Sequence, residues 1–146
     1  MKRKAVFGIG ALLALAALPR AEADRSAGFK IIASPTVKGT AMSRQALAGV
    51  FLGKIERWGD GTRITPIDLS ATSPIRATFS ETMLGMPTLG VRRYWEQRLV
   101  EGGGSPPMVK PSEEAVIAAV ATSEGAIGYV AEETPVPETV KLLVIQ

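Results

Sequence analysis

The 146-residue sequence contains neither cysteine nor histidine. Without cysteine there is no disulfide framework, no thiol nucleophile and no lipid anchor on a processed N-terminal cysteine. Without histidine the commonest general base is missing, and the two absences together exclude zinc sites of the usual Cys/His kind. We therefore expect no metal, no cofactor and no catalytic residue, and a fold that is held together by packing alone.

The excess of basic residues lies at the N-terminus. Lys2, Arg3 and Lys4 precede an uncharged apolar stretch at residues 5–18, and Ala-Glu-Ala follows at residues 21–23. This order is typical of a secretory signal peptide, and the apolar stretch is shorter than the roughly 20 residues that span a membrane. We predict a signal peptide over residues 1–23, cleavage near Ala23 and a periplasmic domain over residues 24–146. A membrane anchor is the less favoured alternative.

Without residues 1–23 the chain is formally neutral, because 13 basic and 13 acidic side chains remain. No basic stripe is left, so binding to nucleic acid has no electrostatic basis. The charged fraction of 21% and the positive mean hydropathy argue against intrinsic disorder. These residues are enough for one domain with a modest core.

Hydrophobic patterns predict strands and helices in alternation, which indicates an α/β fold in a single small domain. We expect roughly four short strands flanked by four helices. Apolar residues on every side of residues 115–121 predict that this helix is the most buried. The expected strands lie at residues 29–33, 64–69, 125–130 and 142–145, and the expected helices begin after Ser43, Ser73 and Ser112 and at Thr88.

A run of hydroxyl side chains precedes the helix that is expected to start at Pro74. Asp68, Ser70, Thr72 and Ser73 lie before it, and Arg76 lies one turn inside it. The first turn of a helix has unpaired N–H groups and a partial positive charge, both of which favour a bound anion. The residue types alone favour a simpler interpretation, in which Ser73 caps the helix and the other residues form a turn.

Three segments resemble phosphate ABC transporter substrate-binding proteins. Residues 51–58 (FLGKIERW) are similar to the family's F-L-G-K-I-x-x-W, and residues 125–130 (GAIGYV) match a strand of that family. Between them, residues 66–73 (PIDLSATS) lie where the family has R-x-D-G-S-G-T-S. The segments occur in the family's order. The resemblance implies one lobe of a type 2 periplasmic binding protein.

The resemblance also implies a function and a site. A phosphate or related oxyanion would bind at Ser70, Thr72, Ser73, Arg76 and Asp68, and the partner would be an ABC transporter permease or a second copy that supplies the missing lobe. The family's arginine falls on Pro66, and its two glycines fall on Leu69 and Ala71. Without the arginine, the chain lacks the cation that would donate two hydrogen bonds to the phosphate. Without the two glycines, it lacks two positions at which the backbone could approach the anion closely.

Two other functions stay open at this stage. In the first, the chain is a periplasmic interaction module that kept the lobe fold, lost its ligand and contacts a protein partner through Leu69 and Ala71. In the second, the chain is a hydrolase that uses Ser70 or Ser73. This last hypothesis is the weakest, because no G-x-S-x-G motif and no histidine base accompany either serine.

Overall fold

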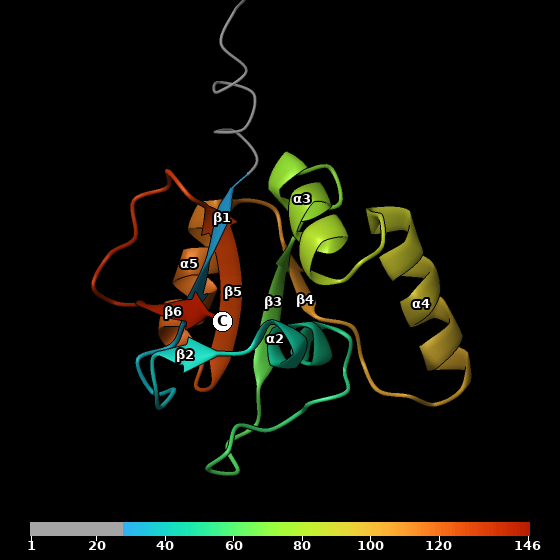
Figure 1. Cartoon of the computed structure of the whole chain (residues 1–146), viewed down its shortest axis with the longest axis horizontal. Helices are drawn as coiled ribbons and strands as arrows, with labels where there is room; N and C mark the ends of the chain where they lie inside the picture. The colour runs from blue at the N-terminus through green and yellow to red at the C-terminus, as the bar shows by residue number, and fades with distance from the viewer. Residues whose placement is uncertain (1–27) are drawn as a thin grey trace, which may run out of the picture.

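The computed structural model describes residues 28–146, so the predicted signal peptide lies outside the described residues. None of the helices in residues 28–146 is long and apolar enough to cross a membrane. Figure 1 shows strands and helices interleaved along the chain. In chain order the elements are β1 (Phe29–Ala33), β2 (Ala41–Met42), α2 (Arg44–Phe51), β3 (Thr65–Leu69), α3 (Pro74–Met83), α4 (Thr88–Val100), β4 (Met108–Lys110), α5 (Glu113–Thr122), β5 (Ala126–Ala131) and β6 (Lys141–Ile145).

The strands form one mixed sheet in the order β2-β6-β1-β5-β3-β4. β5, β3 and β4 run parallel to one another, whereas β1 is antiparallel to both β5 and β6. Because β3 and β4 are parallel, both end at the same edge of the sheet, shortly before α3 and α5 begin. In α/β sheets ligands commonly bind beyond the carboxyl ends of the strands, so this edge is where a site is expected.

Helices cover both faces of the sheet. Gly128 of β5 faces α5, since a Cβ atom placed there would lie 2.9 Å from Val116. The next residue, Tyr129, points to the opposite face because side chains alternate along a strand. Its ring stacks on Phe79 of α3 at 3.9 Å between centroids, and Phe51 of α2 packs edge-on against both rings. The domain therefore has three layers, with α5 on one face and α2 and α3 on the other.

The ends of the predicted helices are confirmed by their caps. The side chains of Ser43, Ser73 and Ser112 each accept a hydrogen bond from the backbone N–H three residues later. Gly53 and Gly85 follow α2 and α3 with φ of 71° and 70°, a conformation that glycine adopts at little cost. The α/β fold class predicted from the sequence is thus confirmed.

Two expectations about these elements are wrong. Within residues 28–146 the sheet has six strands rather than four, and β2 and β4 were not predicted because they are too short to show an alternating pattern. The helix around residues 115–121 is not the most buried. Only Val116 and Val120 are buried in α5, whereas α3 buries five residues. A helix that covers one face of a sheet needs only one fully buried apolar stripe, so Ala119 and Ala121 are only partly buried and Ala118 is exposed.

Candidate functional site

The predicted site residues lie at the sheet edge where β3 and β4 end. The loop of residues 70–73, here called the hydroxyl loop, connects β3 to α3. The Ser70 N–H donates to the carbonyl of Lys110 at the end of β4, at 3.0 Å. The Ser73 N–H donates to the Ser70 carbonyl at 2.9 Å, which closes the loop into a turn. Two neighbouring strands therefore anchor the hydroxyl loop.

Two hydroxyls of the loop lie together on its surface. Ser70 Oγ and Thr72 Oγ1 are 3.1 Å apart, and the Thr72 N–H donates to Ser70 Oγ at 3.4 Å. Ser73 Oγ instead accepts the N–H of Arg76 and caps α3. Pro74 has no N–H, which leaves the N–H of Ile75 as the first-turn donor of α3 without a partner in residues 28–146. The loop thus offers two hydroxyls, and the start of α3 adds the N–H of Ile75.

Asp68 and Arg76 form an ion pair directly behind this loop. Their side chains are 4% and 9% exposed, and Arg76 Nη1 lies 3.1 Å from Asp68 Oδ2. Arg76 Nη1 also donates to the Leu69 carbonyl at 2.7 Å, while the Leu69 N–H donates to Asp68 Oδ1 at 3.0 Å. The ion pair therefore holds both polar groups of the Leu69 backbone, which leads into the hydroxyl loop.

The hydroxyl of Tyr129 completes this buried network by donating to Asp68 Oδ1. Burial raises the pKa of the Asp68 carboxyl above its ordinary value, and the Arg76 guanidinium opposes that shift. Burial and the nearby Asp68 carboxylate also raise the pKa of the Tyr129 hydroxyl, so it stays protonated and acts as a donor. Arg76 Nε donates to Ser80 Oγ at 3.3 Å. These groups position the loop from below.

The structure brings the predicted site residues together in two layers. Ser70 and Thr72 lie at the surface, whereas Asp68 and Arg76 lie beneath them in the ion pair. The hydrogen bonds of Arg76 use Nε and Nη1, and Nη2 makes none within the described part of the chain. A contact between Arg76 and an anion stays a prediction, and in this arrangement Nη2 would make it.

The three residues that depart from the family pattern lie in different surroundings. Leu69, at the first glycine position, is buried at 1% exposure, so its side chain packs into the core. Ala71, at the second, is exposed on the loop. Pro66, at the arginine position, lies in the wall of a separate cavity of about 370 Å³. An arginine there would approach that cavity, whereas Arg76 reaches the Asp68 carboxylate from α3.

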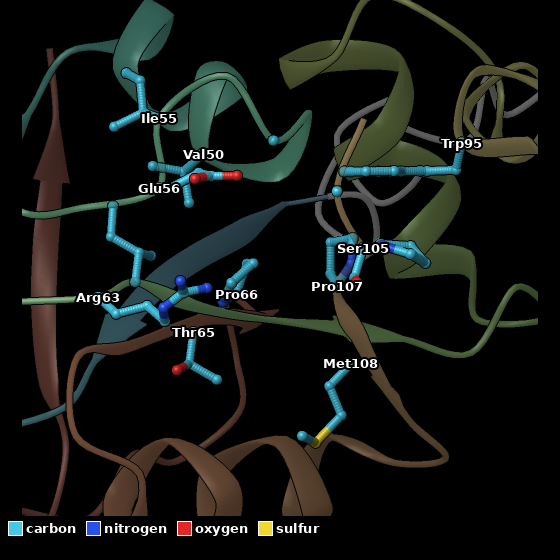
Figure 2. Close-up of a pocket in the computed structure, with 14 residues that line it drawn as sticks. Val50, Ile55, Glu56, Arg63, Thr65, Pro66, Trp95, Ser105, Pro107 and Met108 are labelled. Carbon is cyan, nitrogen blue, oxygen red and sulfur yellow. The ribbon is translucent and has the colours of Figure 1, made fainter. Parts of the chain in front are cut away.

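Figure 2 shows this separate cavity, with Arg63, Thr65 and Pro66 on one side and Trp95 on another. None of the predicted site residues lines it. A larger cavity of about 500 Å³, here called the α4 groove, lies beside the hydroxyl loop. Ala71 and Arg76 line the α4 groove together with residues of α4 and β4. Of these two cavities in residues 28–146, the second therefore adjoins the predicted site.

The fold matches several solved structures. An ABC-type phosphate transport receptor from Vibrio cholerae aligns with a TM-score of 0.63 and 20% identity over 81% of this chain and 46% of that chain. PstS from Borrelia burgdorferi aligns with a TM-score of 0.62 and 18% identity over 89% of this chain and 55% of that chain. This chain has the fold of one lobe of such phosphate-binding proteins.

A third structure with this lobe fold contains bound phosphate. It comes from Clostridium perfringens, is assigned to the phosphate ABC transporter substrate-binding proteins, and aligns with a TM-score of 0.64 and 17% identity over 81% of this chain and 44% of that chain. The chain thus spans about half the length of these proteins. No protein-family model matches the sequence, and no curated protein matches it. The resemblance read from the sequence is confirmed at the level of the fold.

Sequence reasoning missed two residues that shape the site in this lobe. Tyr129 was visible as part of the GAIGYV segment, but its hydrogen bond to Asp68 joins residues 61 positions apart. Trp95 was assigned to one side of a helix, and its place between two cavities depends on how α4 packs. In each case the missing information was the contact between two elements, which no local pattern contains.

Proposed function

We propose that this chain is an exported solute-binding protein that holds phosphate or a related oxyanion at the N-terminus of α3. The anion would contact the hydroxyls of Ser70 and Thr72 and the N–H of Ile75. Ser73 caps the helix, Asp68 and Arg76 position the loop from beneath, and the Nη2 of Arg76 would donate to the anion. The observation that carries the proposal is the surface hydroxyl pair, held at 3.1 Å over a buried ion pair at the end of parallel strands.

The physical chemistry of this arrangement supports an anion. Hydroxyl and N–H donors stabilise negative charge without adding a strongly hydrated cation, and the partial positive charge at the start of α3 adds to them. No acidic residue lies in the first turn of α3 to compete with a ligand. The lobe fold, found in a protein with bound phosphate, is consistent with this proposal.

The proposal includes export and a partner. Residues 1–23 would direct the chain to the periplasm, with cleavage near Ala23. This chain spans about half the length of the matched proteins, and the proposal includes a second surface that closes over the ligand. An ABC transporter permease or a second copy of this chain would supply that surface. Mass spectrometry of the protein from the periplasmic fraction tests the cleavage, since an intact N-terminus would contradict it.

Isothermal titration of the purified protein with phosphate at low ionic strength tests the proposed site. We expect micromolar binding, little binding of sulfate, and loss of phosphate binding in the double variant Ser70→Ala/Thr72→Ala. Both hydroxyls are at the surface, so we expect the free energy of unfolding of the double variant to lie within about 0.5 kcal/mol of that of the wild type. Absence of heat up to millimolar phosphate from folded protein would contradict the proposal.

Thr82→Ala is the matched control for this titration. Thr82 carries an exposed hydroxyl on the last turn of the same helix, where it donates to the Thr78 carbonyl at 2.6 Å. Its removal should leave phosphate affinity unchanged. Equal losses in Thr82→Ala and in the double variant would mean that the effect comes from α3 stability rather than from contacts with the anion.

The interaction-module alternative is less well supported. It required Leu69 and Ala71 to contact a protein partner, but the Leu69 side chain is buried at 1% exposure. Only Ala71 remains at the surface, and one small side chain contributes little apolar area. The hydrolase alternative gains nothing either, because the hydrogen bonds of Ser70 and Ser73 involve hydroxyl and backbone groups rather than a base.

A further inference from the structure

The α4 groove adjoins the hydroxyl loop at Ala71, although Ser70, Thr72 and Ser73 do not line it. Its cavity of about 500 Å³ is lined by Ala71 of the hydroxyl loop and by Arg76, and otherwise mainly by α4 and β4. A molecule bound at the loop would therefore have room to extend along α4. Inorganic phosphate is too small to fill this space, whereas a larger ligand with the same head group would occupy it.

The walls of the α4 groove are apolar and exposed. Leu89 and Leu99 of α4 are 53% and 54% exposed, and Val109 of β4 is 56% exposed. Thr88, Trp95 and Leu99 are seven and four positions apart and so share one face of α4. Apolar side chains gathered around a concave surface are typical of ligand sites. The apolar part of a ligand would be desolvated here.

Two polar atoms among the lining residues lack partners. Trp95 is 6% exposed, and its indole Nε1 is buried without a hydrogen bond. The Thr88 Oγ1 hydroxyl is likewise buried without a partner. Buried donors are satisfied in the great majority of cases, by protein, water or ligand. Both atoms have almost no exposed surface, and Trp95 also lines the separate cavity, so acceptor atoms of a molecule in the groove would reach them only after neighbouring side chains shift.

Charge places the anionic end of such a molecule near the hydroxyl loop. The guanidinium of Arg76 lines the groove, and its Nη2 makes no hydrogen bond within the described residues. Both lining cations are paired, Arg76 with Asp68 and Arg92 with Glu96, but the Arg92 pair lies on the exposed surface of α4, where water and salt screen its charge. An anionic head group is therefore favoured at Arg76 and not at the Arg92 side.

We propose that the ligand is an organic oxyanion, a phosphate monoester or phosphonate with an aryl or short alkyl substituent. Its head group lies at the hydroxyl loop and Arg76, and its apolar part occupies the α4 groove, where acceptor atoms meet Trp95 and Thr88. This inference rests on the proposed function and specifies the ligand class of the same site.

Competing probes test the inference on the full chain. Isothermal titration compares phosphate with para-nitrophenyl phosphate, whose aromatic ring and nitro group supply an apolar part and acceptors. We expect para-nitrophenyl phosphate to bind at least about tenfold more tightly, because buried apolar area adds to the affinity of the head group. Quenching of tryptophan fluorescence should accompany its binding, since the nitro group would lie beside Trp95.

Variants on neighbouring residues separate the groove from the loop. Leu99→Gln removes an apolar wall residue and should reduce the tenfold preference to about threefold or less while leaving phosphate affinity unchanged. The matched control is Val100→Gln, because Val100 is 89% exposed on the same helix and does not line the groove. Thr88→Val keeps the shape of the side chain but removes the donor, and it should weaken only the ester.

The outcomes distinguish the inference from the proposed function. Equal affinity for the two probes, or a preference that survives Leu99→Gln, overturns the inference and leaves phosphate binding intact. Absence of binding for both probes overturns the proposed function and the inference with it. Sedimentation measured in parallel tests whether a second copy of the chain occupies the groove. Self-association that Leu99→Gln abolishes, together with equal affinity for the two probes, would assign the groove to a second copy and overturn the inference.

Discussion

At the scale of single residues, Asp68 is the acceptor on which the buried polar contacts behind the site converge. It accepts hydrogen bonds from Tyr129 and from the Leu69 N–H, and it pairs with Arg76. Buried charges are costly unless a partner and hydrogen bonds compensate them. The sequence offered both members of the pair but no reason to join them, because Asp68 ends a strand and Arg76 lies in the following helix.

Arg76→Met should strongly destabilise the protein. The variant keeps most of the buried volume but leaves the Asp68 carboxylate without its counterion, so we expect the free energy of unfolding to fall by about 3 kcal/mol. Urea denaturation at pH 7 measures this change in the free energy of unfolding. Arg92→Met is the matched control, since Arg92 pairs with Glu96 at the surface and its loss should cost under about 1 kcal/mol. Similar costs for the two variants would mean that the buried pair contributes little.

The pH dependence of stability should report on Asp68. Because burial raises its pKa in the folded state, the folded protein holds this proton more tightly than the unfolded chain does. This tighter proton binding stabilises the folded protein at pH values below the pKa that Asp68 has in the unfolded chain. The stabilisation is lost as the pH rises through the pKa that Asp68 has in the folded protein. Measured by urea denaturation, the unfolding free energy of wild type relative to Asp68→Asn should therefore fall as pH rises from below 4 through the folded pKa. A rise over that range would show that Arg76 and Tyr129 outweigh burial.

At the scale of elements, the packing of α5 on β5 depends on a residue without a side chain. A Cβ atom at Gly128 would lie 2.9 Å from Val116, 3.2 Å from Val120 and 3.3 Å from the Ile67 carbonyl. The same strand carries Tyr129 on its other face. A shift of β5 away from α5 would therefore also move the hydroxyl that donates to Asp68.

Gly128→Ala should lower the free energy of unfolding by about 1–3 kcal/mol, because the added methyl group overpacks the interface between α5 and the sheet. Thermal or urea denaturation measures the change. Gly59→Ala is the control, since nothing lies within 4 Å of a Cβ atom there. Its effect should stay within about 0.5 kcal/mol. A Gly128 variant as stable as the control would mean that α5 moves freely to accept the methyl group.

At the scale of the whole molecule, ligand binding and folding stability are linked. A ligand that binds only the folded protein stabilises it by about 2.7 kcal/mol at 100 times its dissociation constant. For a domain of this size that corresponds to a rise in melting temperature of about 10 °C. We expect this rise with saturating phosphate, measured by calorimetry, and no rise in Ser70→Ala/Thr72→Ala. Equal rises in both proteins would place the anion elsewhere.

Much of the fold could be predicted because its signals are local. Capping serines, glycines after helices and apolar periodicity located each helix and most strands within a residue or two. The short strands β2 and β4 escaped because two or three residues carry no periodicity. The burial of α5 was misjudged because composition states how apolar a helix is, but not how many of its sides another layer covers.

The sequence by itself determined the order of the four helices and the four longer strands, the position of the hydroxyl loop and the absence of cysteine and histidine chemistry, since these depend on composition or on residues that are close together in the chain. Only the tertiary structure decided that Arg76 pairs with Asp68, that Tyr129 joins them from β5, and that an apolar groove opens beside the loop. Those features arise where parallel strands and three helices converge, and contacts of that kind depend on packing between distant segments rather than on any local pattern.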